Sequence, residues 1–540
     1  MQEQQIKDEL LDSTELEIIL DIEKIIGEAF PKINDFSRTT FGLKIENGVV
    51  KGLGLYNKQL KEFPHSICNL EHLEYLVLAS NALKTIPDCI NNLKKLTNLE
   101  LSTNQLEFLP DSLCSLKNLL ILDINRNPFK ELPDSIGNLI NLKELGCNQT
   151  KITALPESIG NLENLIELWV EYGILEHIPE SIGNLNSLKK IYWAGNNISS
   201  LPESIGNLSK LEILILYNNK LTQLPKSIGN LTNLKALVLR QNQLTSLPSS
   251  IGNLSNLLDL SLERNQLTEL PNSLDTLSKL EDLIIDENKL ETFPDSIGKL
   301  MSLKKLCARN NQIKILPDSI GNLETLLVLR LNENQLESIP ETIHKMNKLQ
   351  ELHLKGNQLS SFPENFGLIP SLHDLDLERN QISELPDSFG NLRNLQFLNL
   401  SMNRIRLLPD NFCNLANLRT LKIMDNMLHI LPEDIGKLNK ITEMNLSYND
   451  LVALPDSFGE LINLEKLFLQ RNWLSEIPEY FAKLKNLTHL NLNANALNKL
   501  PLVLNQLQNL EFLWLNQNYY ATLNVEDIKN FKLKNGKIFD

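Results

Sequence analysis

The sequence of 540 residues is poor in aromatic side chains, at 6%, and has no excess of basic charge. Lys and Arg total 52 against 67 Asp and Glu, so the formal charge is 52 − 67 = −15. Because nucleic acid binding relies on a basic surface that neutralises phosphates, this deficit argues against nucleic acid as a partner. Hydrophobic residues still make up 42% of the chain, which excludes a wholly disordered protein.

Long apolar runs and patterned cysteines are also missing. No stretch approaches the ~20 apolar residues that a membrane helix needs, so we expect no membrane insertion. The first ten residues, MQEQQIKDEL, do not resemble a secretory signal. The cysteines form neither a zinc pattern nor a disulfide framework, which favours a reducing, cytoplasmic setting. They are Cys68, Cys89, Cys114, Cys147, Cys307 and Cys413.

Motifs for catalysis are absent as well. The sequence has no phosphate-binding Walker loop, no dinucleotide glycine motif, no H-E-x-x-H and no G-x-S-x-G. The eight histidines share no motif with a plausible metal ligand. We therefore expect a protein that is not an enzyme and that has no cofactor, no metal and no catalytic residues.

What the sequence does contain is one repeat. Segments such as LEYLVLASNAL share the frame L-x-x-L-x-L-x-x-N-x-L, and the frame position recurs from Lys58 to Asn518. That span is 518 − 58 = 460 residues, or 20 periods of 23 without an insertion, which gives 21 repeats. Lys58, Thr150 and Gly173 are the three departures from Asn, and 20 of the 23 prolines share one phase.

Each part of the repeat has a physical role. The L-x-L core predicts a short strand whose alternate leucines are buried between neighbouring repeats. The Asn amide can pair with backbone groups where the chain leaves the strand, and stacked repeats would form an asparagine ladder. Proline ends that segment, and Ser-Ile-Gly-Asn-Leu predicts an apolar 3₁₀ or short helical turn on the outer side. A repeat of this kind is stable only within a stack.

These residues resemble the leucine-rich repeat family. The 23-residue version with Leu-Pro-x-x-Ile is similar to an intracellular subclass that includes the Shoc2/Sur-8-like, Scribble and Erbin scaffolds and plant Ras-group-related proteins. The resemblance implies an α/β solenoid, a horseshoe or superhelix with a parallel β-sheet on its concave face and short 3₁₀ or helical turns on its convex face. We predict a repeat domain over residues 50–521, with caps at 1–49 and 522–540.

The N-terminal region differs in composition. Residues 1–30 hold nine acids and two lysines, a net charge of −7, with apolar residues at helical spacing from Leu11 to Ile26. Thr14 and Glu17 fit a capping box. We interpret this helix as a cap with its acids in solvent, and docking of a partner is the alternative. After it, Asn47-Gly48 predicts a hairpin that adds a strand before the first repeat.

Aromatic side chains gather at two places on the expected concave face. Exposed Trp, Tyr and Arg dominate protein interfaces, so we predict two protein-binding clusters. The alternative is that these aromatics simply pack across strands, and that those nearest the C-terminus belong to the cap. The predicted binding residues are Trp169, Glu171, Tyr172, Tyr192, Ile213, Ile215 and Tyr217 in the first cluster, and Phe468, Arg471, Trp473, Phe512 and Trp514 in the second.

Between the clusters lies a charged stretch of alternating sign, from Arg240 to Arg379. We interpret it as a self-neutralised face whose opposite charges pair across adjacent strands, with docking of a charged partner as the alternative. Cys307 falls on the same face between Lys305 and Arg309. We expect a tolerated surface cysteine there rather than a reactive thiolate.

The resulting functional prediction is a cytoplasmic, non-enzymatic scaffold that binds a protein partner on its concave face. The family resemblance implies signal transduction around a small GTPase or a phosphatase. An extracellular adhesive or structural repeat protein is the main alternative. A regulatory sensor that acts in trans with a ubiquitin-ligase-like enzyme is a further one.

Overall fold

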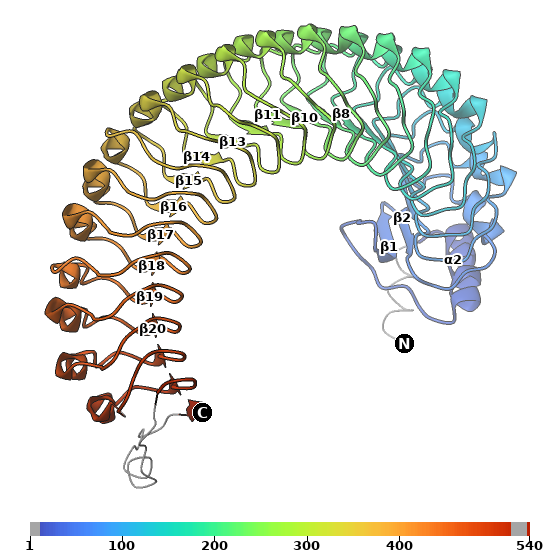
Figure 1. The fold of residues 1–540 in the computed structure, drawn as a ribbon. Coiled ribbons are helices and arrows are strands. Elements are labelled where there is room, and N and C mark those ends of the chain that lie inside the picture. The colour runs from blue at the N-terminus through green and yellow to red at the C-terminus, as the bar shows by residue number, and fades with distance from the viewer. Residues whose placement is uncertain (1–10, 500, 520–536, 540) are drawn as a thin grey trace. The chain divides into compact units, whose positions relative to one another are not determined.

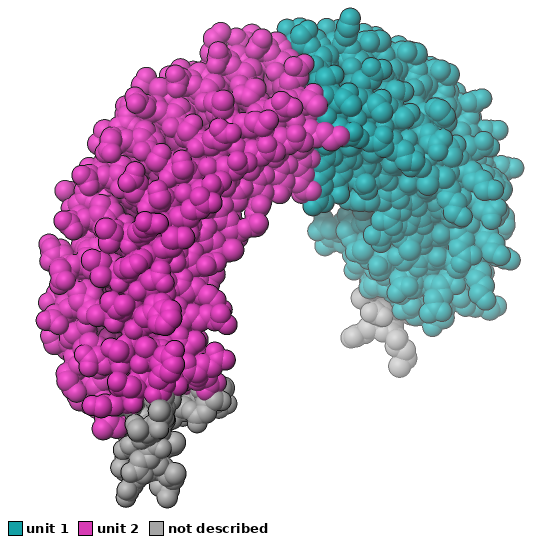
Figure 2. Space-filling model, viewed as in Figure 1, with its two compact units in different colours: residues 1–266 teal, residues 267–540 magenta. Residues whose placement is uncertain are grey.

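The computed structural model describes residues 11–499, 501–519 and 537–539. It contains two compact units, Met1–Gln266 and Leu267–Asp540 (Figure 2). Within each unit the repeats are stacked side by side, with short strands along the inner side and short helical turns along the outer side (Figure 1). The predicted solenoid with a parallel sheet and 3₁₀ turns is confirmed.

The strands of the first unit are β1 (Phe41–Glu46), β2 (Val49–Leu55), β3 (Tyr75–Val77), β4 (Asn98–Glu100), β5 (Ile121–Asp123), β6 (Glu144–Gly146), β7 (Glu167–Trp169), β8 (Lys190–Tyr192), β9 (Ile213–Ile215), β10 (Ala236–Val238) and β11 (Asp259–Ser261). Those of the second unit are β12 (Asp282–Ile284), β13 (Lys305–Cys307), β14 (Val328–Arg330), β15 (Glu351–His353), β16 (Asp374–Asp376), β17 (Phe397–Asn399), β18 (Thr420–Lys422), β19 (Glu443–Asn445), β20 (Lys466–Phe468), β21 (His489–Asn491), β22 (Phe512–Trp514) and β23 (Lys537–Phe539).

The helices of the first unit are α2 (Ser13–Ile26) and the 3₁₀ turns η1 (His65–Asn69), η2 (Asp88–Asn92), η3 (Leu113–Ser115), η4 (Asp134–Asn138), η5 (Glu157–Asn161), η6 (Glu180–Asn184), η7 (Glu203–Asn207), η8 (Lys226–Asn230) and η9 (Ser249–Asn253). The second unit has η10 (Asn272–Thr276), η11 (Asp295–Lys299), η12 (Asp318–Asn322), η13 (Glu341–Lys345), η14 (Phe366–Leu368), η15 (Asp387–Asn391), η16 (Asp410–Asn414), η17 (Ile435–Lys437), η18 (Asp456–Glu460), η19 (Glu479–Lys483) and η20 (Leu502–Gln506).

Parallel pairing places equivalent residues of successive repeats side by side. Leu237 of β10 pairs with Leu214 of β9 on one side and with Leu260 of β11 on the other. All three leucines are fully buried, whereas the residues that flank each of them face the opposite side of the sheet. The core of each repeat is therefore completed by its neighbours, and no repeat buries its apolar face alone.

The asparagine ladder is confirmed, and Asn242 illustrates its geometry. The Asn242 Nδ2 group donates to the Leu239 carbonyl of its own repeat (2.9 Å) and to the Leu216 carbonyl of the preceding one (3.0 Å). The Asn242 Oδ1 atom accepts from the backbone N–H of Leu221 in that preceding repeat (3.0 Å). One buried amide thus satisfies three backbone groups and joins two repeats.

The ladder changes at two successive departures from Asn. The Thr150 hydroxyl donates to the Cys147 carbonyl (2.9 Å), and Gly173 has no side chain to contribute. Two residues before the frame position, another side chain links adjacent repeats: Asn148 Oδ1 accepts from the backbone N–H of Glu171 (2.7 Å). Asn125 Oδ1 accepts in the same way from the N–H of Asn148.

The outer turns also follow the predicted pattern. Pro202 directly precedes η7 with φ −69°, and the side chains of Ile205 and Leu208 are fully buried. The Glu203 carboxylate accepts from the backbone N–H of Ser227 in the next repeat (3.0 Å), so adjacent turns are linked as well.

The N-terminal helix corrects two expectations. Helix α2 is capped by Asp12, whose side chain accepts from the N–H groups of Thr14 and Glu15, so the predicted capping box is wrong. The acids of the helix do not all lie in solvent, because Glu15 is 5% exposed and its carboxylate accepts from the N–H of Val50 (2.5 Å). Glu15 therefore attaches α2 to the first repeat.

The predicted hairpin is confirmed. Strands β1 and β2 pair antiparallel around Asn47 and Gly48, which have φ values of 52° and 81°. Strand β2 then pairs parallel with β3, so the hairpin provides the extra strand before the first complete repeat. Of the predicted C-terminal cap at 522–540, only Lys537–Phe539 lies within the described residues, as a strand parallel to β22.

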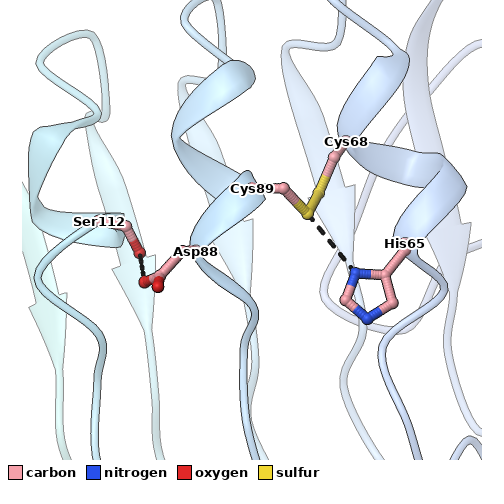
Figure 3. Close-up of a disulfide and its surroundings, with 5 residues drawn as sticks. All are labelled: His65, Cys68, Asp88, Cys89 and Ser112. Atoms are coloured by element: carbon pink, nitrogen blue, oxygen red, sulfur yellow. Dashed lines mark hydrogen bonds between the residues drawn. A yellow bond between two sulfur atoms is a disulfide. The ribbon is translucent and has the colours of Figure 1, made fainter.

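The cysteines give a further correction, because Cys68 and Cys89 form a disulfide (Figure 3). Cys68 lies in η1 and Cys89 in η2, so stacking of adjacent turns brings them together, and the His65 Nδ1 atom lies 3.7 Å from the Cys89 sulfur. Cys307 was expected at the surface but is 1% exposed, and burial raises the pKa of its thiol to about 11. It is therefore unsuited to act as a thiolate.

Candidate functional site

The first predicted cluster lies on the strand face of the first unit. Trp169 of β7 and Tyr192 of β8 pair in register, and their ring centroids are 5.0 Å apart. Tyr192 and Ile215 of β9 occupy the same register position in the next pair of strands. With Ile213, these half-buried side chains form a continuous apolar face across three strands. We call it the aromatic surface, and we include Glu171, Tyr172 and Tyr217 at its border.

Tyr172 and Tyr217 lie in the turns that follow β7 and β9, as Glu171 does, so the strand-face placement predicted for these three residues is wrong. Their hydroxyls are hydrogen-bonded to each other, and this contact, together with burial, raises the pKa of Tyr217 to about 12. The guanidinium of Arg240 lies 4.5 Å from the Tyr217 ring centroid, a cation–π distance. Tyr172 also covers Gly195, which has φ +67° and where a Cβ would lie 2.8 Å from the Tyr172 ring.

Acidic groups border the aromatic surface and are in part paired. Glu167 accepts from the Trp169 indole N–H (3.2 Å) and from Lys190 (2.7 Å), an interaction that raises the pKa of Lys190. Burial raises the pKa of Glu171. The guanidinium of Arg38, which comes from the segment between α2 and β1, lies 5.8 Å from the Trp169 ring centroid.

The second predicted cluster divides into two places. Phe468 lies on β20, and Phe512 and Trp514 lie on β22, where the His489 ring of β21 is 4.5 Å from that of Phe512. The two rings on β22 have centroids 6.0 Å apart. These residues occupy the strand face, as expected. Strand β23 pairs with β22, so this cluster borders the C-terminal strand.

Arg471 and Trp473 do not lie on the strand face. They flank Asn472 in the turn after β20, because the strand ends at Phe468. Arg471 has φ 56°, and its guanidinium lies 4.9 Å from the Tyr448 ring centroid. Both residues line a cavity of about 610 Å³ with Tyr519. The strand-face placement predicted for them is therefore wrong, whereas their predicted binding role stays a prediction.

The charged stretch of the second unit pairs as expected. Arg309 forms a hydrogen-bonded ion pair with Asp286, 2.7 Å from Nη2 to Oδ2, and Arg330 lies 2.8 Å from Glu351. Further pairs join Lys355 to Glu378 and Arg379 to Glu333. Most of these side chains are half-buried, and the pairing offsets charges of opposite sign on this face.

The matches to family models agree with this geometry. The family described as "Leucine-rich repeat region" matches residues 53–145, 111–194, 226–312, 295–379 and 364–449. The chain belongs to the leucine-rich repeat family. Models described as "Leucine rich repeat" and "Leucine Rich repeats (2 copies)" match residues 186–244 and 462–502. A comparison with curated proteins finds no match.

Several solved structures are similar to this chain. A leucine-rich repeat protein of Leptospira interrogans is 32% identical, with TM-score 0.60, over 77% of this chain and 100% of that one. A plant peptide hormone receptor in complex with its peptide is 29% identical, with TM-score 0.61, over 88% and 89%. The Arabidopsis receptor kinase HAESA, in complex with a peptide hormone and a co-receptor, is 27% identical, with TM-score 0.54, over 94% of each chain.

Other site types receive no support from the described residues. Among them, no three His, Cys, Asp or Glu side chains are grouped so that they could hold a metal ion. In the same part of the chain, no helix has the length and apolarity needed to cross a membrane. The leucine-rich repeats instead offer surfaces suited to protein–protein interaction.

One group of residues was missed by sequence reasoning. Glu100 and Asp123 are buried on the strand face at 7% and 2% exposure, and Arg38 approaches both. Their sequence signal was available, because both acids lie four residues before a frame asparagine in consecutive repeats. Arg38 lies before the first repeat and has no repeat phase, so nothing in the sequence indicates that it lies over β4 and β5.

Proposed function

We propose that this protein is a non-enzymatic scaffold that binds a protein partner through the aromatic surface of its first unit. The observation that carries this proposal is the half-buried face of Trp169, Tyr192, Ile213 and Ile215, which has aromatic anchors in its centre and charged groups at its rim. Protein interfaces commonly have this composition. By resemblance to the Shoc2/Sur-8-like subclass, we propose a small GTPase or a phosphatase as partner, in cytoplasmic signal transduction.

The dimensions of the surface support a protein partner. Adjacent parallel strands lie ~4.8 Å apart, so the aromatic surface on β7 to β9 extends roughly 10 Å along the stack, which suits the side chains of a docked protein segment. Among the similar structures, a plant receptor binds a peptide hormone, and HAESA binds a peptide hormone and a co-receptor. We propose the same kind of use for this chain, with a different partner.

The test is recovery of partners by affinity purification with the full chain. Trp169→Ala combined with Tyr192→Ala should lower recovery of the main partner at least tenfold, since anchors of this type contribute ~2 kcal/mol or more each. Lys355→Ala combined with Glu378→Ala is the matched control, because it removes a paired, half-buried site in the second unit. Equal recovery with both double variants, each folded by circular dichroism, would refute the proposal.

A second candidate is a binding protein of an oxidising compartment. The Cys68–Cys89 disulfide favours it, because disulfides persist mainly outside the reducing cytoplasm. Alkylation of the protein after acid quenching of its native cells distinguishes the two. Labelling of all six cysteines supports the cytoplasmic proposal, whereas labelling limited to the four unpaired ones supports the second candidate.

A further inference from the structure

The segment between α2 and β1 covers part of the strand face in the first unit. Its Phe36 ring stacks on Tyr75 of β3 with centroids 5.7 Å apart, and it fits closely against Gly52 of β2, where a Cβ would collide with the ring. The Thr40 carbonyl at the end of the segment accepts from the N–H of Tyr56 (3.2 Å). The segment is thus held in place at both Phe36 and Thr40.

A cavity of about 260 Å³ lies beneath this segment. Its walls include the rings of Phe36 and Tyr75, the apolar Ile121, the guanidinium-bearing Arg38, and the acids Glu100 and Glu144. Cavities for drug-sized ligands are ~300–1,000 Å³, so this one suits a single side chain or a small group.

The charges around the cavity do not balance. Arg38 is the cation that approaches the acids, with its Nε atom 3.7 Å from Glu100 Oε1 and its Nη1 atom 3.3 Å from Asp123 Oδ2. Glu100 Oε2 is buried and accepts no hydrogen bond, and Glu100 can share a proton with the neighbouring Asp123 carboxylate. The Arg38 side chain is 49% exposed, so it does not fill the site. A buried carboxylate oxygen without a partner is costly, and a donor that reaches it would be strongly favoured.

We propose that this cavity binds a guanidinium group on a short apolar stem, as in an arginine side chain of a docked protein. A planar guanidinium can donate to Glu100 while it packs against an aromatic ring of the cavity wall, which a compact ammonium group does less well. Arg38 lies over Trp169 as well, so the cavity adjoins the aromatic surface. The identity of the ligand as a partner's arginine rests on the proposed function, but the cavity can be tested without that partner.

The probe is Nα-acetylarginine methylamide, titrated into the full chain and followed by calorimetry, with the citrulline analogue as its neutral isostere. We expect the arginine compound to bind at least tenfold more tightly than the citrulline compound, because a hydrogen bond to a charged group is lost in the latter. Glu100→Gln should weaken the arginine compound at least tenfold. Glu212→Gln is the control, since Glu212 is paired with Lys235 away from the cavity.

Dependence on pH supplies a second readout. Burial and the Asp123 carboxylate raise the pKa of Glu100 to about 8, so binding of the cation should strengthen as Glu100 loses its proton between about pH 7 and 9. The other groups that face Glu100 are Arg38 from the covering segment and Glu144 from β6. Glu100→Gln should remove this dependence.

Equal affinity for the arginine and citrulline compounds, or an unchanged affinity in Glu100→Gln, would overturn this inference. If the arginine compound binds but the Trp169 and Tyr192 double variant recovers its partner fully, the guanidinium site is supported and the proposed function is rejected. If the double variant loses its partner but the arginine compound does not bind, the proposed function is supported and the guanidinium site is rejected.

Discussion

Replacement of Asn242 by Ala tests how much one ladder residue contributes to the stack. Asn242 is 8% exposed, and its side chain satisfies the carbonyls of Leu216 and Leu239 and the N–H of Leu221. The substitution leaves the Leu221 N–H without this partner, whereas each of the two carbonyls still accepts from the frame asparagine of a neighbouring repeat or of its own repeat. One buried unsatisfied group costs ~1–3 kcal/mol, and each hydrogen bond lost at the two carbonyls costs a further ~0.5–1.5 kcal/mol. We therefore expect a loss of about 3–5 kcal/mol.

The assay is amide hydrogen exchange, because a stack of repeats opens locally and a single unfolding free energy would conceal the effect. Protection of the Leu221 amide and of the neighbouring strand amides in β9 and β10 should fall by a factor that corresponds to this free energy. Gln243→Ala is the control, since Gln243 is exposed and its side chain lies outside the ladder. A loss below about 1 kcal/mol would show that water replaces the amide, and the ladder argument would then be wrong.

Three further predictions concern other parts of the chain. The pKa of Glu100 is raised to about 8 in the folded chain, whereas an unfolded glutamate loses its proton near pH 4.3. The folded state therefore binds the extra proton between these values, so Tm should fall as the pH rises from about 4.5 to 8. Glu100→Gln should flatten this dependence of Tm on pH. Phe389→Ala should lower the stability of its repeat, measured by amide exchange, by ~3–5 kcal/mol and Phe389→Leu by less than ~1.5 kcal/mol, since Phe389 is fully buried. Reduction of the Cys68–Cys89 disulfide, whose two cysteines are 21 residues apart, should lower the stability of the first repeats by about 3 kcal/mol. An unchanged rate of amide hydrogen exchange in these repeats would contradict this prediction.

The periodic features of this fold could be predicted from the sequence because each has a local cause. Alternating leucines such as Leu237 and Leu239 require a buried face, and the proline before each outer turn fixes the chain direction. Positions that share a repeat phase share an environment, so the sequence alone places Trp169, Tyr192 and Ile215 together on the strand face.

Features that break the period could not be predicted in the same way. Cys68 and Cys89 are 21 residues apart rather than 23, so they differ in phase, and only the stacking of two turns brings them together. Trp473 is a different case: it lies one residue beyond its frame asparagine, so its repeat phase places it in the turn, and the strand-face prediction misread a signal that the sequence contains. Asp12 and Thr14 are both good helix caps, and the local sequence does not decide between them.

The constant register also determines how the protein responds to tension. Side chains such as Asn242 join each repeat to its neighbour through hydrogen bonds to backbone groups, here those of Leu216 and Leu221. A pulled chain can therefore release one repeat while the next remains intact. Every release frees 23 residues, which extend to about 80 Å. Within each unit the chain therefore acts as a series of equal extensible links, which lengthen stepwise under load.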